Sequence, residues 1–164
     1  RHYDDALLEM EDIVREAGFV PFAAAALVAQ HTYGEIQVGR PNAADLAEDR
    51  AFAARAAAKL AKGHLARVPI PGNRPYRAGG TRGQFRPLTN GNCVHCGLCA
   101  RECPQGAIDP QDVAKIDGSK CLACFRCIRR CPVGAKNMDI PAYQAFAKDF
   151  SAKLSVRLEN EYFL

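Results

Sequence analysis

The sequence contains no long hydrophobic run. Its longest apolar stretch is FAAAALVA, at residues 22–29. A helix that spans a bilayer needs roughly 20 apolar residues in succession, so we expect no membrane span. No segment has the basic start and apolar centre of a secretory signal peptide either, and we therefore expect a cytoplasmic protein.

The sequence also lacks any basic run interleaved with aromatic residues, which is the pattern that stacks bases and neutralises phosphates. The net charge of +4 is mild for a chain of 164 residues. We therefore expect no nucleic-acid partner. The chain opens at Arg1 without a methionine and enters a helical pattern at once, which predicts an upstream segment.

Cysteine is absent from residues 1–92 and from residues 132–164. The overall composition, 48% hydrophobic and 24% charged, is that of a globular protein, yet all eight cysteines lie between residues 93 and 131. A secreted disulfide scaffold would spread its cysteines through the fold. The clustering instead predicts a reducing compartment and metal ligation.

The eight cysteines form two copies of one motif. Each copy reads C-x2-C-x2-C-x3-C and is followed directly by proline. The offset is constant, because 121 − 93 and 131 − 103 both equal 28, and this indicates an internal duplication. The first copy contains Cys93, Cys96, Cys99 and Cys103, and the second contains Cys121, Cys124, Cys127 and Cys131.

This spacing is typical of ligands to cubane iron–sulfur clusters. The first three thiolates of a copy reach three irons of one cluster, whereas the fourth lies too far along the chain to close the same cluster. In two-cluster proteins the fourth cysteine binds the other cluster. We therefore predict two [4Fe–4S] clusters with exchanged ligands. The first is held by Cys93, Cys96, Cys99 and Cys131, and the second by Cys121, Cys124, Cys127 and Cys103.

Two other schemes use the same cysteines. In one, each copy holds a cluster with its own four cysteines, which the spacing disfavours. In the other, the cysteines bind structural zinc, which usually takes two C-x2-C pairs separated by a longer stretch. His95 lies inside the first loop, but eight cysteines already supply two clusters. We therefore expect His95 behind the ligands or at the surface.

The residues around the cysteines favour electron transfer over catalysis. A thiolate on every iron leaves no coordination position open for a substrate. Ile108, Val113 and Ile116 are spaced to cover the clusters with apolar surface. Positive residues beside the second copy either raise the reduction potential of its cluster and attract an acidic redox partner, or simply face water. These residues are Lys120, Arg126, Arg129 and Arg130.

Before the cysteines, the sequence predicts a helix, a strand and a second helix. Residues 1–18 have helical periodicity, and residues 19–30 form an apolar run that suits a buried parallel strand better than a helix. The second helix starts at the N-cap Asn42, with Asp45 placed for a capping box, and ends at Gly63. The predicted buried residues are Ala6, Leu7, Met10, Ile13, Val14 and Ala17 in the first helix, and Leu46, Phe52, Ala53, Ala56, Ala57 and Leu60 in the second. This order is a fragment of an α/β layer.

A segment rich in proline, glycine and arginine joins these elements to the cysteines. Residues 64–88 have no apolar period and read as a linker. The stretch GGTRG at residues 79–83 lacks the Gly-Lys-Ser/Thr ending of a phosphate-binding loop, and no strand leads into it. After the cysteines, residues 141–156 predict a helix whose apolar face must dock on another part of the protein.

Residues 89–137 resemble the bacterial-type two-[4Fe–4S] ferredoxins. The stretches RHYDDALLEMEDIVREAGF, FVPFAAAALVAQHTYG and GRPNAADLAEDRAF resemble the C-terminal half of a flavodoxin-like, doubly wound domain. With the linker PGNRPYR and the ending ENEYFL, nearly the whole chain resembles the EFR1-type flavodoxin–ferredoxin fusions. The resemblance implies an α/β part followed by an α+β ferredoxin domain.

In detail, the resemblance implies a flavodoxin-like part at 1–63, a linker at 64–88, the ferredoxin domain at 89–137 and a helical tail at 138–164. It also implies an anaerobic electron carrier that exchanges electrons with FMN when the upstream half is present. Tyr3 is then the candidate to stack on the flavin, or else it only caps the first helix. Two further interpretations remain open. The chain is the electron-supplying part of a flavin-dependent oxidoreductase, or a docking module of a larger redox complex.

Overall fold

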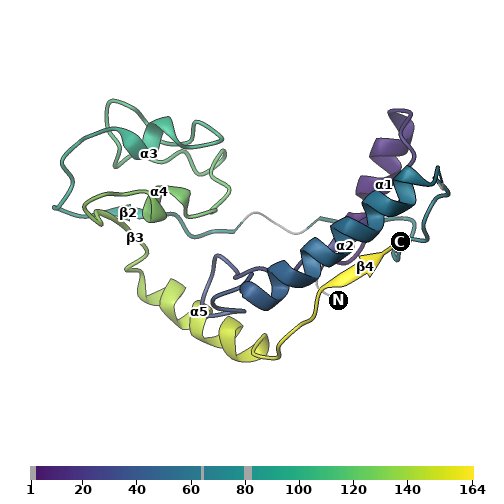
Figure 1. The fold of residues 1–164 in the computed structure, drawn as a ribbon. Helices are drawn as coiled ribbons and strands as arrows, with labels where there is room; N and C mark the ends of the chain where they lie inside the picture. Colours follow the sequence, from purple (N-terminus) through teal and green to yellow (C-terminus); the bar gives the residue numbers. More distant parts are fainter. Residues whose placement is uncertain (1–2, 64, 80–82) are drawn as a thin grey trace. The chain divides into compact units, whose positions relative to one another are not determined.

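The computed structural model describes residues 3–63, 65–79 and 83–164, which form a mixed set of helices and short strands (Figure 1). The chain divides into two compact units. The first contains Arg1–His31, Gln37–Gly79 and Ser155–Leu164, and the second contains Thr32–Ile36 and Gly80–Leu154. Within the described residues, no helix is both long and apolar enough to cross a membrane.

The first unit begins with helix α1, Ala6–Glu16, where the sequence predicts a helix. Of the predicted apolar face only Leu7 is fully buried, and most of the rest is wrong. Met10 and Ile13 are 55% and 60% exposed, and the buried residues are Leu7, Leu8 and Glu11. The reason is that the segment after α2 packs on the Leu8 side of α1, so that a Cβ on Gly72 would lie 2.7 Å from the Leu8 Cβ.

Arginines of this segment pair with the acidic residues of α1 and its N-terminal end. Arg74 donates to the Asp12 carboxylate at 2.6 and 2.9 Å, Arg77 donates to Asp4 at 2.7 Å, and Arg67 pairs with Glu11. Hydrogen bonds from Arg74 and Tyr76 lower the pKa of Asp12 to about 2. The arginine-rich stretch therefore lies along α1 through several charge-assisted contacts.

Helix α2, Ala43–Ala61, starts at the predicted cap. Asn42 accepts from the Ala44 and Asp45 N–H groups, and the Asp45 carboxylate accepts from the Asn42 N–H, so the predicted capping box is confirmed. The predicted buried side is largely wrong, because Leu46, Ala53, Ala57 and Leu60 are exposed. The buried and half-buried residues lie on a neighbouring face of the helix, and they are Asp45, Asp49, Phe52, Ala56 and Lys59.

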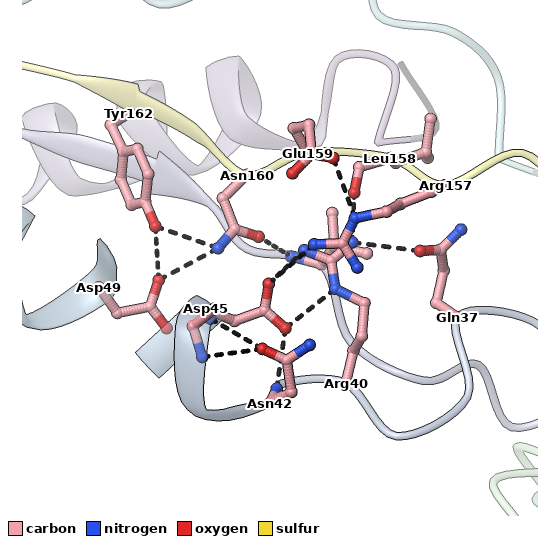
Figure 2. Close-up of polar contacts among 12 residues, drawn as sticks. Gln37, Arg40, Asn42, Asp45, Asp49, Arg157, Leu158, Glu159, Asn160 and Tyr162 are labelled. Atoms are coloured by element: carbon pink, nitrogen blue, oxygen red, sulfur yellow. Dashed lines mark hydrogen bonds and ion pairs between the residues drawn. The ribbon is translucent and has the colours of Figure 1, made fainter. Parts of the chain in front are cut away.

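The C-terminal strand explains why this other face of α2 is covered. Strand β1, Ala24–Ala26, lies within the predicted strand but is much shorter. The predicted burial and parallel pairing are wrong, because β1 is only half-buried and its partner β4, Glu161–Phe163, is antiparallel. The Tyr162 ring lies 4.9 Å from the Phe52 ring, and its hydroxyl donates to Asp49 at 2.7 Å. The end of the chain, which the sequence does not predict as a strand, therefore covers one side of α2 (Figure 2).

A buried ion pair fixes the same tail at the start of α2. Arg40 donates to the two Asp45 oxygens at 3.0 and 2.6 Å and also donates to the Leu158 carbonyl. Arg157 of the tail lies 3.6 Å from Asp45 (Figure 2). The hydrogen bond from Arg40 and that from the Asn42 backbone lower the pKa of Asp45 to about 2. Sequence-distant residues thus complete the environment of one carboxylate.

The second unit contains the cysteines. It comprises the short helices α3, Leu98–Arg101, and α4, Arg126–Arg129, the antiparallel strands β2, Leu88–Thr89, and β3, Lys136–Asn137, and helix α5, Pro141–Lys153. The last of these confirms the helix predicted after the cysteines. The hydrophobic core of the second unit is formed by Ala123, Phe125 and Met138. The partly buried residues that pack against this core are Tyr33, Phe85, Ile128, Ile140 and Tyr143.

Candidate metal centre

The backbone around the two motifs repeats with the same offset as the sequence. Helices α3 and α4 start and end 28 residues apart, as their bounds Leu98–Arg101 and Arg126–Arg129 show. Left-handed φ angles recur in pairs: His95 and Ala123 at 53° and 53°, Gly97 and Phe125 at 71° and 57°, and Gly106 and Gly134 at 56° and 62°. The duplication is therefore one of conformation as well as of sequence.

The first motif and the end of the second share one cavity. Cys93, Cys96, Cys99 and Cys131 line a cavity of about 330 Å³, measured with its open mouth. Val113 and Lys136 belong to the same wall. Three cysteines of the first copy thus meet the fourth cysteine of the second.

The second cavity has the converse composition. Cys121, Cys124, Cys127 and Cys103 line a space of about 390 Å³, again with its open mouth. Ile108 and Ile116 lie in its wall. The three apolar residues predicted to cover the clusters therefore all line one cavity or the other. None of the eight cysteines forms a disulfide.

Backbone N–H groups point at the sulfurs in equivalent places. The Ala107 N–H donates to the Cys103 sulfur at 3.3 Å, and the Ala135 N–H donates to the Cys131 sulfur at 3.1 Å. Ala123 donates likewise to Cys121 at 3.4 Å. Such donors stabilise negative charge on a thiolate, and they are one means by which a protein sets the reduction potential of an iron–sulfur cluster.

The thiols differ in how readily they ionise. Burial raises the pKa of the Cys127 thiol to about 11, and the positive charge of Lys136 opposes this rise. For Cys131 burial acts in the same direction, but the N–H groups of residues 133–136 outweigh it and lower the pKa. Four soft thiol donors, apolar walls and N–H groups on sulfur make each cavity a fitting site for a cubane cluster.

The charges predicted to act on the second cluster are largely paired with carboxylates. Arg126 and Arg130 lie 2.9 and 3.0 Å from Glu102, and Lys120 lies 3.8 Å from Asp117. Arg129 is exposed, as is His95. Glu102 and Arg130 are 28 residues apart in the sequence, so this pair joins equivalent positions of the two halves.

Tyr3, the predicted flavin contact, lies at the start of α1 in the first unit. Its hydroxyl donates to Glu161 of β4 at 3.0 Å, and its carbonyl accepts from the Ala6 N–H at 2.9 Å. The structure therefore places Tyr3 beside the C-terminal strand. Its role toward a flavin stays a prediction.

Two residues of this centre escape a reading of the sequence alone. Lys136 lines the first cavity although lysine usually indicates surface. Phe125 combines a left-handed backbone with a buried ring. The only signal in the sequence is the alignment of the copies, which sets Lys136 against Ile108 and Phe125 against Gly97.

Comparison with protein families agrees with this geometry. A family described as "4Fe-4S dicluster domain" matches residues 92–135, which include all eight cysteines. No curated protein matches the chain. The chain thus contains a ferredoxin-type 4Fe-4S domain, and its chemistry is electron transfer through iron–sulfur clusters.

Proposed function

We propose that this protein carries single electrons through two [4Fe–4S] clusters with exchanged ligands. Cys93, Cys96, Cys99 and Cys131 hold the first cluster, and Cys121, Cys124, Cys127 and Cys103 hold the second. The observation that carries this proposal is the composition of the two cavities, each with three cysteines of one copy and the fourth of the other. Neither copy lines a complete site by itself.

Anaerobic purification followed by iron and sulfide analysis and EPR of the reduced protein tests the proposal. Two cubane clusters require about eight irons per chain. A content of four irons, or the finding of zinc, contradicts it.

The exchange of ligands is tested with a matched pair of variants. Cys103→Ser should perturb the EPR signal of the cluster bound by the second motif, and Cys131→Ser should perturb that of the first. These two residues occupy equivalent positions, so each variant is the control for the other. If Cys103→Ser instead damages the first-motif cluster, each motif holds its own cluster and the exchanged scheme is wrong.

We also propose that the first unit is part of a flavodoxin-like domain whose FMN exchanges electrons with the clusters. The order α1, β1, α2 supports this, as do the exposed apolar side chains of Met10, Ile13 and Phe19, which an adjoining sheet would cover. Tyr3 is the candidate flavin contact. Titration of the full-length protein, with the upstream half included, should quench the fluorescence of FMN, and Tyr3→Ala should weaken its binding. An unquenched titration would remove flavin from the proposal but leave the clusters in it.

A docking module of a larger redox complex is the second candidate, because the same exposed apolar residues also suit a protein partner. We propose an acidic redox partner in the cytoplasm of an anaerobic cell. Retention of a partner during purification at high salt favours the docking module, whereas free exchange of electrons with added soluble carriers favours the independent carrier.

A further inference from the structure

Lys136 is a buried cation inside the metal centre. It is 3% exposed, it is among the residues that line the cavity of the first cysteine set, and its ammonium group donates to the Val113 carbonyl. Val113 lines the same cavity. The positive charge of Lys136 also acts on Cys127, which belongs to the second cavity. The ammonium group therefore lies close to the wall of the first cavity, and its charge acts on a thiol of the second.

The burial of Lys136 requires an explanation. Removing an ammonium group from water is costly unless an anion compensates for it. In the part of the chain that the structure describes, Lys136 forms no ion pair with a carboxylate; its hydrogen bond is to a neutral carbonyl. The available negative charge is that of the cysteine sulfurs, and it becomes permanent when thiolates bind iron.

The duplication shows that the fold does not need a lysine at this position. The equivalent residue of the other copy is Ile108, which is buried in the wall of the second cavity. The same backbone position thus accepts an apolar side chain in one copy and carries a charge in the other. A purely structural requirement would be met by isoleucine in both.

We propose that Lys136 is an internal counter-cation of the two-cluster centre and raises the reduction potentials of both clusters. The inference rests on the proposed function, because it needs both clusters. When one electron arrives from a low-potential one-electron donor, the negative charge of the centre increases by one unit. Lys136 stabilises that charge through Coulomb attraction in surroundings of low dielectric constant.

The exposed cations around the second motif cannot supply the same effect. Arg126 and Arg130 share Glu102, and their side chains are 55% and 57% exposed. Water and salt screen such charges, whereas a buried charge is screened much less. The burial of Lys136, and not the number of basic residues nearby, therefore determines how strongly the centre attracts electrons.

The test is a set of EPR-monitored redox titrations with dithionite as reductant. Lys136→Met removes the charge with little change in length, and Lys136→Gln removes it while keeping a donor for the Val113 carbonyl. In both variants we expect the equilibrium constant for reduction of each cluster to fall about tenfold. For a one-electron couple this lowers each midpoint potential by about 59 mV. The fall should persist at high salt. Lys136→Arg should keep potentials close to those of the unaltered protein.

Two controls separate charge from packing. Lys136→Arg alters the packing and keeps the charge, and Lys120→Met removes a cation that is 59% exposed and paired with Asp117. Both should leave the potentials nearly unchanged. If Lys136→Met takes up too little iron, Lys136→Gln decides the result.

Three outcomes overturn the inference: unchanged potentials in Lys136→Met and Lys136→Gln, an equal fall in Lys136→Arg, or a shift that vanishes at high salt. Iron analysis and EPR of the unaltered protein keep this result separate from the proposed function. Two intact clusters with potentials insensitive to Lys136 would refute this inference alone.

Discussion

Phe125 offers a direct test of how packing and backbone strain balance beside the second cysteine set. Its side chain is 7% exposed, and its ring lies 5.1 Å from that of Tyr33 and 5.6 Å from that of Tyr143. Truncation of a buried phenylalanine to alanine costs about 3–5 kcal/mol. Its φ of 57°, however, is in the left-handed region, which a residue with a Cβ occupies at a cost of about 1–2 kcal/mol.

The two terms predict an unusual order of stability. Both variants lose the ring. Phe125→Ala still has a Cβ at the unfavourable φ, whereas Phe125→Gly has no Cβ and is not strained there. Glycine gives back about 0.4–1 kcal/mol because its unfolded chain is more flexible. The glycine variant should therefore be more stable than the alanine variant by about 1 kcal/mol, or up to about fivefold in unfolding rate.

Loss of the visible absorbance of the clusters in guanidinium, followed anaerobically, measures that rate. Gly97→Ala provides the control, because Gly97 holds the equivalent position at a φ of 71°. This variant should be less stable than the unaltered protein by about the same free energy that separates the alanine and glycine variants of Phe125. If Phe125→Ala loses its clusters no faster than Phe125→Gly, the left-handed backbone carries no cost and the reasoning fails.

Two further predictions concern the first unit. Asp45 has its pKa lowered from 3.8 to about 2, so the stability that it supplies is present above about pH 4 and is lost as the pH falls toward 2. Hydrogen exchange of the β4 amides, corrected for intrinsic rates, should show protection lost over that range, and Asp45→Asn should give low protection already at neutral pH. If Asp45→Asn is protected as well as the unaltered protein, the Arg40–Asp45 pair does not have this role. Gly72→Ala should separate the arginine-rich stretch from α1, because its Cβ would meet Leu8 at 2.7 Å and overpacking costs about 1–3 kcal/mol. Trypsin should then cut this stretch faster. Gly79→Ala is the control, because its Cβ would have no atom within 4 Å, and it should not change the rate of cleavage.

The four cysteines that the sequence assigns to each cluster also line one cavity together, and their ligation stays a prediction. The assignment follows from the motif spacing and from the ligand exchange of two-cluster proteins, and it needs no reference to the rest of the fold. The capping box at Asn42 and Asp45 was predictable because it depends only on contacts within a few residues.

The covered faces of the helices were not predictable in this way. Helical periodicity shows which residues lie on one side, but the side that is buried depends on what packs there. In α1 that is the segment containing Gly72, and in α2 it is the strand containing Tyr162. Both are distant in sequence and are anchored by charges and hydrogen bonds, which a search for apolar periodicity does not detect.

The path of the chain gives the pairing of β1 with β4 a further consequence. Because Ser155–Leu164 returns to the first unit, the cluster-bearing residues are an insertion within that unit and not an appendage at its end. A protease that cuts once in the stretch leading into the clusters leaves them attached through the stretch leading out. After such a cut, the only link between the clusters and the described part of the first unit is the segment Ser155–Leu164 and its pairing with β1.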